Sequence, residues 1–152
     1  MKKLFLFLIL ITALFSSCKN ELVKRITSTF KSGLPEKIEY YKIEGDTEVL
    51  VKHVIFYKTG EKRLEGGFLG NERNGTWSYW HENGNKWSEG NFSEGISHGK
   101  TTVWYDNGKK HYTGNFVDGK TDGKWTYWAI DGAKVKEVYF KNGKKISEES
   151  FE

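Results

Sequence analysis

A repeat of 24 residues constrains the fold of this chain more than any other feature of its sequence. From about residue 52 onward, glycine and aromatic residues recur at this spacing in five columns without an insertion. Such a period is typical of arrays in which each unit packs on the next. The columns are Gly60, Gly84, Gly108 and Gly132; Phe68, Phe92, Phe116 and Phe140; Gly75, Gly99 and Gly123; Gly95, Gly119 and Gly143; and Phe56, Trp80, Trp104 and Trp128.

Each unit contains two turn signals separated by strand-forming residues. The segments "ENGN", "DNGK" and "IDGA" carry an Asn-Gly or Asp-Gly pair, which favours a two-residue type I′ turn. The segments "SEGISHGK" and "VDGKTDGK" predict a second, longer turn. Between the turns, "TWSYW", "TTVWY" and "KWTYW" are rich in aromatic and β-branched residues and lack a helical period. We therefore predict an all-β fold, a repeat array of antiparallel β-hairpins that forms an elongated, twisted meander sheet.

The predicted turns also fix which side chains share a face. A two-residue loop at Asn83-Gly84 pairs Trp80 with Trp87 and Trp77 with Gly90. Side chains alternate along a strand, so one face is expected to be continuously apolar and to place large side chains beside the strand glycines. The opposite face is expected to carry aromatic residues near the tight turns and polar residues further along. Its predicted members are Phe56, Arg63, Trp80, Trp87, Trp104, His111, Trp128 and Val135, followed by Glu65, Glu89, Thr113 and Glu137.

The repeat divides the chain into an N-terminal leader and one domain. We assign residues 1–17 to a signal peptide, 18–28 to a tether and 29–152 to the hairpin domain. Within the domain, a degenerate first copy with three extra residues precedes four regular units. The copies are 29–51, 52–75, 76–99, 100–123 and 124–147.

The N-terminus has the pattern of an exported protein. Two lysines precede an apolar run over residues 4–15, and Ser16, Ser17 and Cys18 follow. The run is too short to span a bilayer comfortably and predicts a signal peptide. The segment "FSSC" resembles a bacterial lipobox, which implies cleavage before Cys18, a lipid attached to Cys18 and anchoring in the cell envelope, at the outer membrane of a Gram-negative cell. A plain secretory signal or an uncleaved anchor is the alternative.

Cysteine content and charge exclude several functions. Cys18 is the only cysteine, so a disulfide framework or a thiolate metal site is excluded. The formal net charge is +4, and removal of residues 1–17 takes away two of the 24 basic residues against 20 acidic ones, which leaves about +2. This excess is too small to indicate a nucleic-acid partner.

The segment "YTGNFVDG" (112–119) matches the Y-x-G-x-[FW]-x-x-G core of the MORN repeat, and "SEGNFSEG", "LEGGFLGN" and "KEVYFKNG" are looser copies. The full unit resembles the bacterial MORN-repeat variant, including proteins labelled as the YwqK family of antitoxins. The resemblance covers roughly residues 50–145 and departs from the pattern at Asn71 and Val138. It implies a β-hairpin array that mediates protein contacts and sometimes lipid contacts, and the label implies a toxin as one partner.

The residues do not form a recognisable catalytic or metal-binding pattern. The histidines fall on separate strands or in a loop, and the turn aspartates are explained by hydrogen bonds to their own backbone. The segment "GNFVDGKT" (114–121) fits the P-loop pattern, but a turn and a strand follow it where a P-loop requires a helix. We therefore expect no enzymatic activity, no cofactor, no metal site and no nucleotide binding.

The aromatic column is the best candidate for function. Clustered exposed tryptophans are enriched in binding hot spots, although they can equally cover one face of a single-layer sheet. We therefore predict a non-catalytic membrane-anchored interaction module, with two alternatives: a lipoprotein that binds carbohydrate or an envelope polymer, and an antitoxin or immunity-type protein. Lysines beside the turns, such as Lys62, Lys86 and Lys110, could contact anionic lipid. The candidate partner-binding residues are Phe56, Trp80, Trp87, Trp104, His111 and Trp128.

Overall fold

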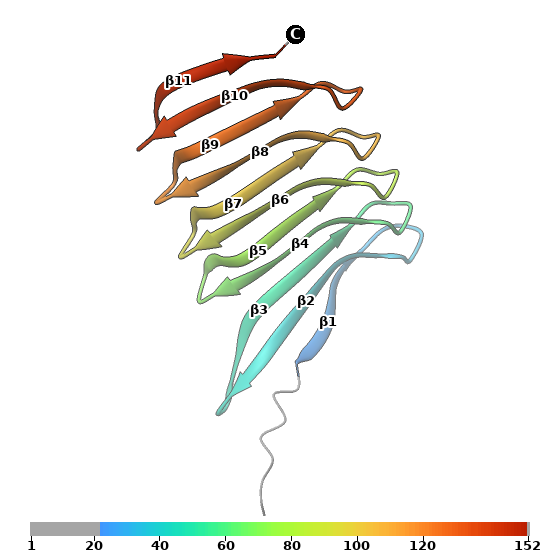
Figure 1. The fold of residues 1–152 in the computed structure, drawn as a ribbon. Helices are drawn as coiled ribbons and strands as arrows, with labels where there is room; N and C mark the ends of the chain where they lie inside the picture. The colour runs from blue at the N-terminus through green and yellow to red at the C-terminus, as the bar shows by residue number, and fades with distance from the viewer. Residues whose placement is uncertain (1–21, 152) are drawn as a thin grey trace, which may run out of the picture.

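Residues 22–151 form a single antiparallel sheet of eleven strands in which every strand pairs with its neighbour in the chain. The structure, a computed structural model, describes residues 22–151. The strands rise in chain order and rotate progressively, as Figure 1 shows. The predicted all-β hairpin array is therefore confirmed. The strands are β1 (Val23–Thr29), β2 (Pro35–Glu44), β3 (Thr47–Phe56), β4 (Lys62–Leu69), β5 (Glu72–Trp80), β6 (Lys86–Ser93), β7 (Ile96–Trp104), β8 (Lys110–Val117), β9 (Lys120–Trp128), β10 (Lys134–Lys141) and β11 (Lys144–Ser150).

The N-terminal boundary of the sheet differs from the predicted one. Residues 23–28, which the sequence assigned to a tether, belong to β1 and pair with β2. This edge strand is mostly polar and exposed, and even Ile26, which pairs with Ile38, is 55% exposed, so its sequence lacks the apolar alternation of the other strands. The predicted signal peptide and Cys18 lie outside the described residues. No membrane-spanning helix is found in the described part of the chain.

The turn at each Asn-Gly or Asp-Gly signal is a three-residue loop and not the predicted two-residue turn. The Gly84 N–H donates to the carbonyl of His81 at 3.0 Å, and the His81 N–H donates to the carbonyl of Asn85 at 2.8 Å. Gly84 has a φ of 84°, whereas Asn83 does not have a positive φ. This geometry is a type I turn followed by one left-handed glycine and a bulge. The side chain of Asn83 favours it, because its Oδ1 accepts the N–H of Asn85 at 3.0 Å.

The two-residue type I′ turns lie at the other end of the strands, where the sequence predicted longer ones. Among the described non-glycine residues, positive φ is confined to Glu94, Asp118 and Asn142, each followed by a glycine of positive φ. Ser93 pairs directly with Ile96 across one such turn. The second half of each expected long turn therefore belongs to a strand. Figure 1 shows the wider loops and the tight turns on opposite edges of the sheet.

The three-residue loop displaces the pairing by one residue beside it. Trp80 pairs with Lys86, and Tyr79 pairs with Ser88, so Trp87 is the extra residue of a bulge. Away from the loop the predicted register is confirmed, as in the pairs Trp77–Gly90 of this hairpin and Val103–Tyr112 of the next. The predicted Trp80–Trp87 pair is wrong.

One face, here called the core face, carries a network of edge-to-face aromatic rings. The Trp77 ring centroid lies 5.4 Å from that of Phe68 and 6.2 Å from that of Phe92. Trp125 has the same place in its repeat and lies 5.1 Å from Phe116. Trp77 is 2% exposed and Trp125 is 5% exposed, although no second layer covers them in the described residues. Neighbouring side chains in the same sheet therefore suffice to bury these rings.

Strand glycines make room for the two buried tryptophans. A Cβ on Gly114 would lie 2.1 Å from the Trp125 ring, and a Cβ on Gly66 would lie 2.1 Å from the Trp77 ring. Although Trp77 pairs with Gly90, its ring therefore lies over Gly66, on the strand at its other side. The glycines are structural, as predicted, but each accommodates the tryptophan that follows it in the chain.

We expect Gly114→Ala to destabilise the protein by about 1–3 kcal/mol, because the added methyl group overlaps the Trp125 ring. Gly90→Ala is the matched control, since its Cβ would meet only Thr101 Oγ1 at 3.3 Å. Neither glycine has a positive φ, so backbone strain does not contribute to the difference. Urea denaturation of the two variants measures it. Equal losses of stability in the two variants would show that the Trp125 ring does not require a glycine at position 114.

Candidate interaction surface

Four of the six predicted partner-binding residues form a regular row. Phe56, Trp80, Trp104 and Trp128 are the last residues of β3, β5, β7 and β9. All four are half-buried and lie beside the three-residue loops. The row therefore crosses the sheet perpendicular to its strands, on the face opposite the core face.

A second row of lysines alternates with these aromatic residues. Because of the bulge, the first residue of each following strand pairs with the last residue of the preceding one. The prediction that Arg63, Trp87, His111 and Val135 lie opposite the aromatic residues on this face is therefore wrong. The pairs are Phe56–Lys62, Trp80–Lys86, Trp104–Lys110 and Trp128–Lys134, and we call these eight residues the lysine–aromatic stripe.

The ammonium groups of three stripe lysines lie over its rings, and that of Lys134 lies over Phe151. Lys62 Nζ is 5.0 Å from the centroid of Trp80, and Lys86 Nζ is 5.6 Å from the same ring. Lys110 Nζ lies 5.6 Å from the centroid of Trp128. At a partly exposed site each contact contributes about 0.5–1 kcal/mol. The sequence signal for these lysines was their own period of 24 residues, which the expected turn geometry obscured.

The two other predicted partner-binding residues are not part of the stripe. Trp87 is 48% exposed and its ring centroid lies 5.9 Å from that of Tyr79. The His111 ring stacks on Tyr105 with a centroid distance of 4.4 Å. Both contacts place these side chains on the core-face side of the sheet, because bulged residues leave the strict alternation of the strand.

A row of carboxylates runs parallel to the stripe, further from the loops, as predicted. Glu89 accepts from Lys86 at 2.5 Å and from the Ser78 hydroxyl at 3.2 Å. Glu137 pairs with Lys134 at 3.0 Å and with Lys124 at 3.4 Å. The row of carboxylates continues in the first regular unit, where Glu65 lies between Lys52 and Lys62. In the third unit Thr113 occupies the equivalent place.

The lysines lower the pKa values of these carboxyl groups. The hydrogen bond from Lys86 is the main cause of the lowered pKa of Glu89, and the bond from Lys134 is the main cause for Glu137. Burial alone would raise the pKa of Glu65, but the bonds from its two lysines outweigh it and the pKa is lowered. All three glutamates are therefore held in the charged form.

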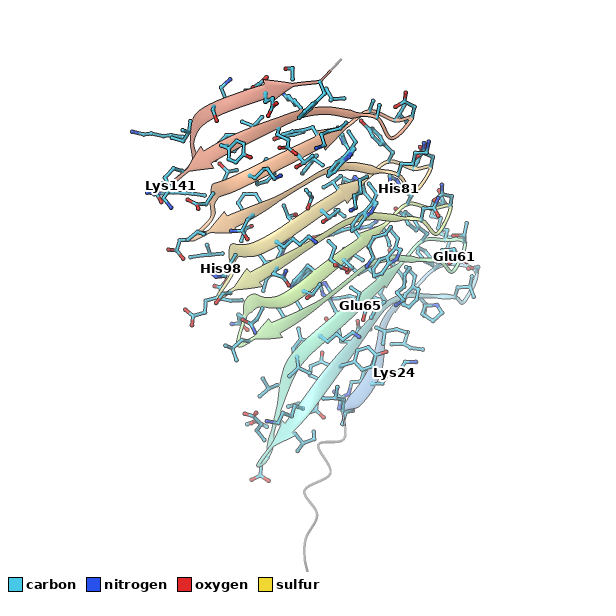
Figure 2. The ribbon with its side chains drawn as sticks, viewed as in Figure 1. Lys24, Glu61, Glu65, His81, His98 and Lys141 are labelled. Atoms are coloured by element: carbon cyan, nitrogen blue, oxygen red, sulfur yellow. The ribbon has the colours of Figure 1, made fainter. Side chains whose placement is uncertain are left out.

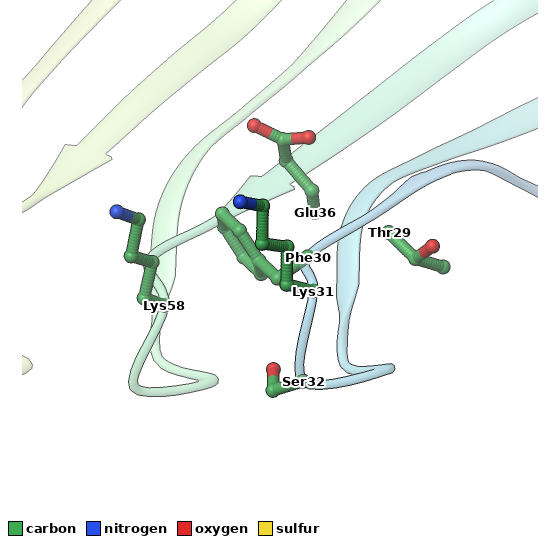
Figure 3. A pocket seen from close by; sticks show the side chains of 6 residues that line it. All are labelled: Thr29, Phe30, Lys31, Ser32, Glu36 and Lys58. Atoms are coloured by element: carbon green, nitrogen blue, oxygen red, sulfur yellow. The ribbon is translucent and has the colours of Figure 1, made fainter.

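Several hollows lie beside the loops, and two of them bear on the stripe and on the first loops. One of about 270 Å³ opens within the stripe between Phe56 and Trp80, with Lys62 on its wall. The other, of about 520 Å³, lies between the first two loops. Figure 3 shows that Phe30, Lys31 and Lys58 point the same way in this hollow, with Glu36 beyond them.

The histidines lie apart, as predicted. His81 lies at the loop end of the strands and His98 at the tight-turn end, as Figure 2 shows. His53 packs against Phe68 at 4.9 Å, and its burial lowers its pKa. Within residues 22–151, no group of three or more His, Cys, Asp or Glu side chains could hold a metal ion. The P-loop-like segment 114–121 spans β8, a tight turn and the start of β9, so its interpretation as a hairpin is confirmed.

Comparisons with known proteins agree with this architecture. Residues 73–94 and 97–118 match the family model described as the MORN repeat variant. The matched segments contain the hairpins β5–β6 and β7–β8, so the predicted resemblance is confirmed for these two units. No curated protein matches the chain.

Two solved structures show partial likeness. The chain described as "Crystal Structure of TarM" is 19% identical with a TM-score of 0.44, over 82% of this chain and 22% of that chain. A point mutant of S. aureus TarM in complex with Fondaparinux, alpha-GlcNAc-glycerol and UDP is 17% identical with a TM-score of 0.30, over 84% of this chain and 21% of that chain. This chain thus spans about a fifth of the length of either.

We expect the lysine–glutamate pairs to make stability depend on acid pH. A carboxyl group whose pKa is lower in the folded state stabilises the protein above its unfolded pKa of about 4.3, and this stability is lost as the pH falls through the folded value. Glu89→Gln should therefore reduce the loss of unfolding free energy between neutral pH and about pH 3. Glu82→Gln, in an exposed loop, is the control. Chemical denaturation at several pH values measures both, and parallel profiles for the two variants would contradict the assignment.

Proposed function

We propose that this chain is a non-catalytic interaction module, exported and anchored by lipid, whose lysine–aromatic stripe contacts its partner at a membrane surface. The observation that carries the proposal is the stripe itself, eight side chains in register across β3 to β10. No other layer of the described chain covers that face.

The repeat architecture supports an interaction function. MORN repeats are generally associated with protein or membrane interaction, and two units of this chain match their variant. Catalysis needs one constellation of different groups, whereas a repeat presents the same groups several times along one axis. Such a surface suits an extended partner. Tryptophans supply large contact areas, and lysines supply favourable contacts with acidic groups.

The N-terminal sequence supports the anchoring part of the proposal. Residues 1–17 would direct export, and a lipid on Cys18 would hold the domain at the envelope, at the outer membrane in a Gram-negative cell. The sheet begins at Val23, so the tether between the lipid and the domain would be short. An exported anchor fits a cytoplasmic antitoxin poorly, and we take the YwqK label as a family resemblance and not as a function.

A triple Trp80→Ala, Trp104→Ala, Trp128→Ala variant should lose the envelope components that the full-length chain captures on crosslinking in cells. The aromatic rings provide the contact area, so capture should fall by about tenfold or more. Trp87→Ala is the matched control, because this exposed tryptophan lies off the stripe. Circular dichroism establishes that both variants remain folded. If the folded triple variant and the wild type recover the same components, the stripe only packs within the sheet and does not bind a partner.

Replacement of Cys18 by alanine should abolish incorporation of radiolabelled fatty acid, because the thiol is the proposed acceptor. Ser17→Ala keeps a small residue before the cysteine and should retain labelling. Gel autoradiography of the two variants with the wild type gives the answer. Unchanged labelling of the Cys18→Ala variant would place the lipid elsewhere and refute the anchor.

A further inference from the structure

We propose that the ligand of the lysine–aromatic stripe is an extended anionic polysaccharide that carries about one carboxylate per disaccharide. The inference rests on the proposed function, in which the stripe is the contact surface, and it adds the chemical class of what binds there. It depends on the charge of the stripe, its spacing, the hollow between Phe56 and Trp80 and the twist of the sheet.

Averaged over the four repeats, the lysines exceed the carboxylates of this face by about one positive charge per repeat. Glu65 is shared by Lys52 and Lys62, and Glu137 is shared by Lys124 and Lys134. Two lysines against one carboxylate leave an excess of one in each set. Glu89 is paired with Lys86, and the charge of Lys100, which belongs to the third repeat, also lowers its pKa.

The third repeat has no glutamate at this place and contributes both Lys100 and Lys110. Thr113 replaces the glutamate, and its hydroxyl is 3.1 Å from that of Thr102. Lys110, at the start of the same strand, has no ion pair within residues 22–151 and lies over the Trp128 ring. Over the four repeats seven lysines therefore face three glutamates, an average excess of one positive charge per repeat, and Lys110 carries its charge without an ion pair in the described residues.

The spacing of these charges matches a polymer of sugars. Strands in a sheet lie about 5 Å apart, so equivalent residues two strands apart are separated by about 10 Å. This distance is close to the length of one disaccharide in an extended polysaccharide. A chain laid across the strands would therefore present carboxylates at about the same average spacing as the excess positive charges.

The rings and the hollow between them suit the sugar units. The apolar faces of pyranose rings stack on aromatic side chains, and the hollow between Phe56 and Trp80 has an aromatic ring and an ammonium group on its walls. The lysines now lie over the tryptophan rings. A carboxylate would draw the ammonium groups towards itself and leave the rings to the sugar.

The twist of the sheet favours a flexible polymer over a flat surface. Figure 1 shows the strands rotating progressively from β2 to β11, so a row of side chains at the strand ends follows a curved path. A planar membrane would meet only part of such a path, whereas a polysaccharide can follow all of it. We therefore favour the polymer over anionic lipid head groups.

The test measures binding of hyaluronate oligosaccharides, which carry one carboxylate per disaccharide, to the full-length chain in detergent micelles. Their uncharged methyl esters are the matched probes, and quenching of tryptophan fluorescence is the readout. Oligosaccharides of four disaccharides should bind about tenfold more tightly than those of two, because they engage more repeats. Added salt should weaken binding.

Two lysine variants test the site. Lys110→Gln should weaken binding about two- to fivefold, because it removes an unshared cation without leaving a carboxylate unpaired. Lys120→Gln removes the same charge from an exposed lysine at the tight-turn end of β9 and should leave binding unchanged. Trp104→Ala should weaken binding by about tenfold.

Three results would overturn the inference. The first is equal binding of the oligosaccharides and their methyl esters, and the second is an equal effect of the two lysine variants. The third is binding of phosphatidylglycerol vesicles but not of hyaluronate, which would identify the stripe as a membrane contact. If hyaluronate fails to bind while the triple tryptophan variant still loses its crosslinked partners, the ligand class is wrong and the interaction function stands.

Discussion

The single left-handed glycine after each type I turn determines which side chain reaches which face of this sheet. It adds one residue to the strand that follows, and the bulge pairs each strand-ending aromatic residue with a strand-starting lysine, as in Trp104 and Lys110. A two-residue loop would have paired Trp104 with His111 instead. Lysines alternate with aromatic rings along the stripe because the same backbone conformation occurs at every loop.

The loops also connect one repeat to the next. The Tyr57 hydroxyl donates to the carbonyl of Trp80 at 2.8 Å, and the Tyr105 hydroxyl donates to that of Trp128 at 2.9 Å. The Asn107 side chain donates to the carbonyl of Ile130, one loop further on, at 2.9 Å. Each unit thus contacts only its neighbours, so stability is close to a sum of unit and interface contributions. The sheet needs no second layer, because these bonds and the rings of adjacent strands provide the packing.

Much of this architecture could be predicted from the columns of the repeat. Period and alternation were enough to place Trp77 opposite Gly90 and to separate the aromatic column of Trp80 from the buried rings. The loop geometry was not predicted, because Asn-Gly pairs favour type I′ turns on average. Thr59 stands at the same loop position as Asn83, and a β-branched residue disfavours positive φ, so this signal for a single left-handed glycine was present in the sequence. Edge strand β1 escaped prediction because an edge needs little apolar surface.

The threonine that interrupts the glutamate row affects where along the array a periodic ligand can bind. On a surface that repeats identically, a ligand with the same period has several positions of equal energy and can shift by one unit without cost. Thr113 breaks that equivalence, since the third repeat has a lone lysine where its neighbours have a shared carboxylate. One unit that differs from the others therefore fixes the position at which such a ligand binds along the whole array.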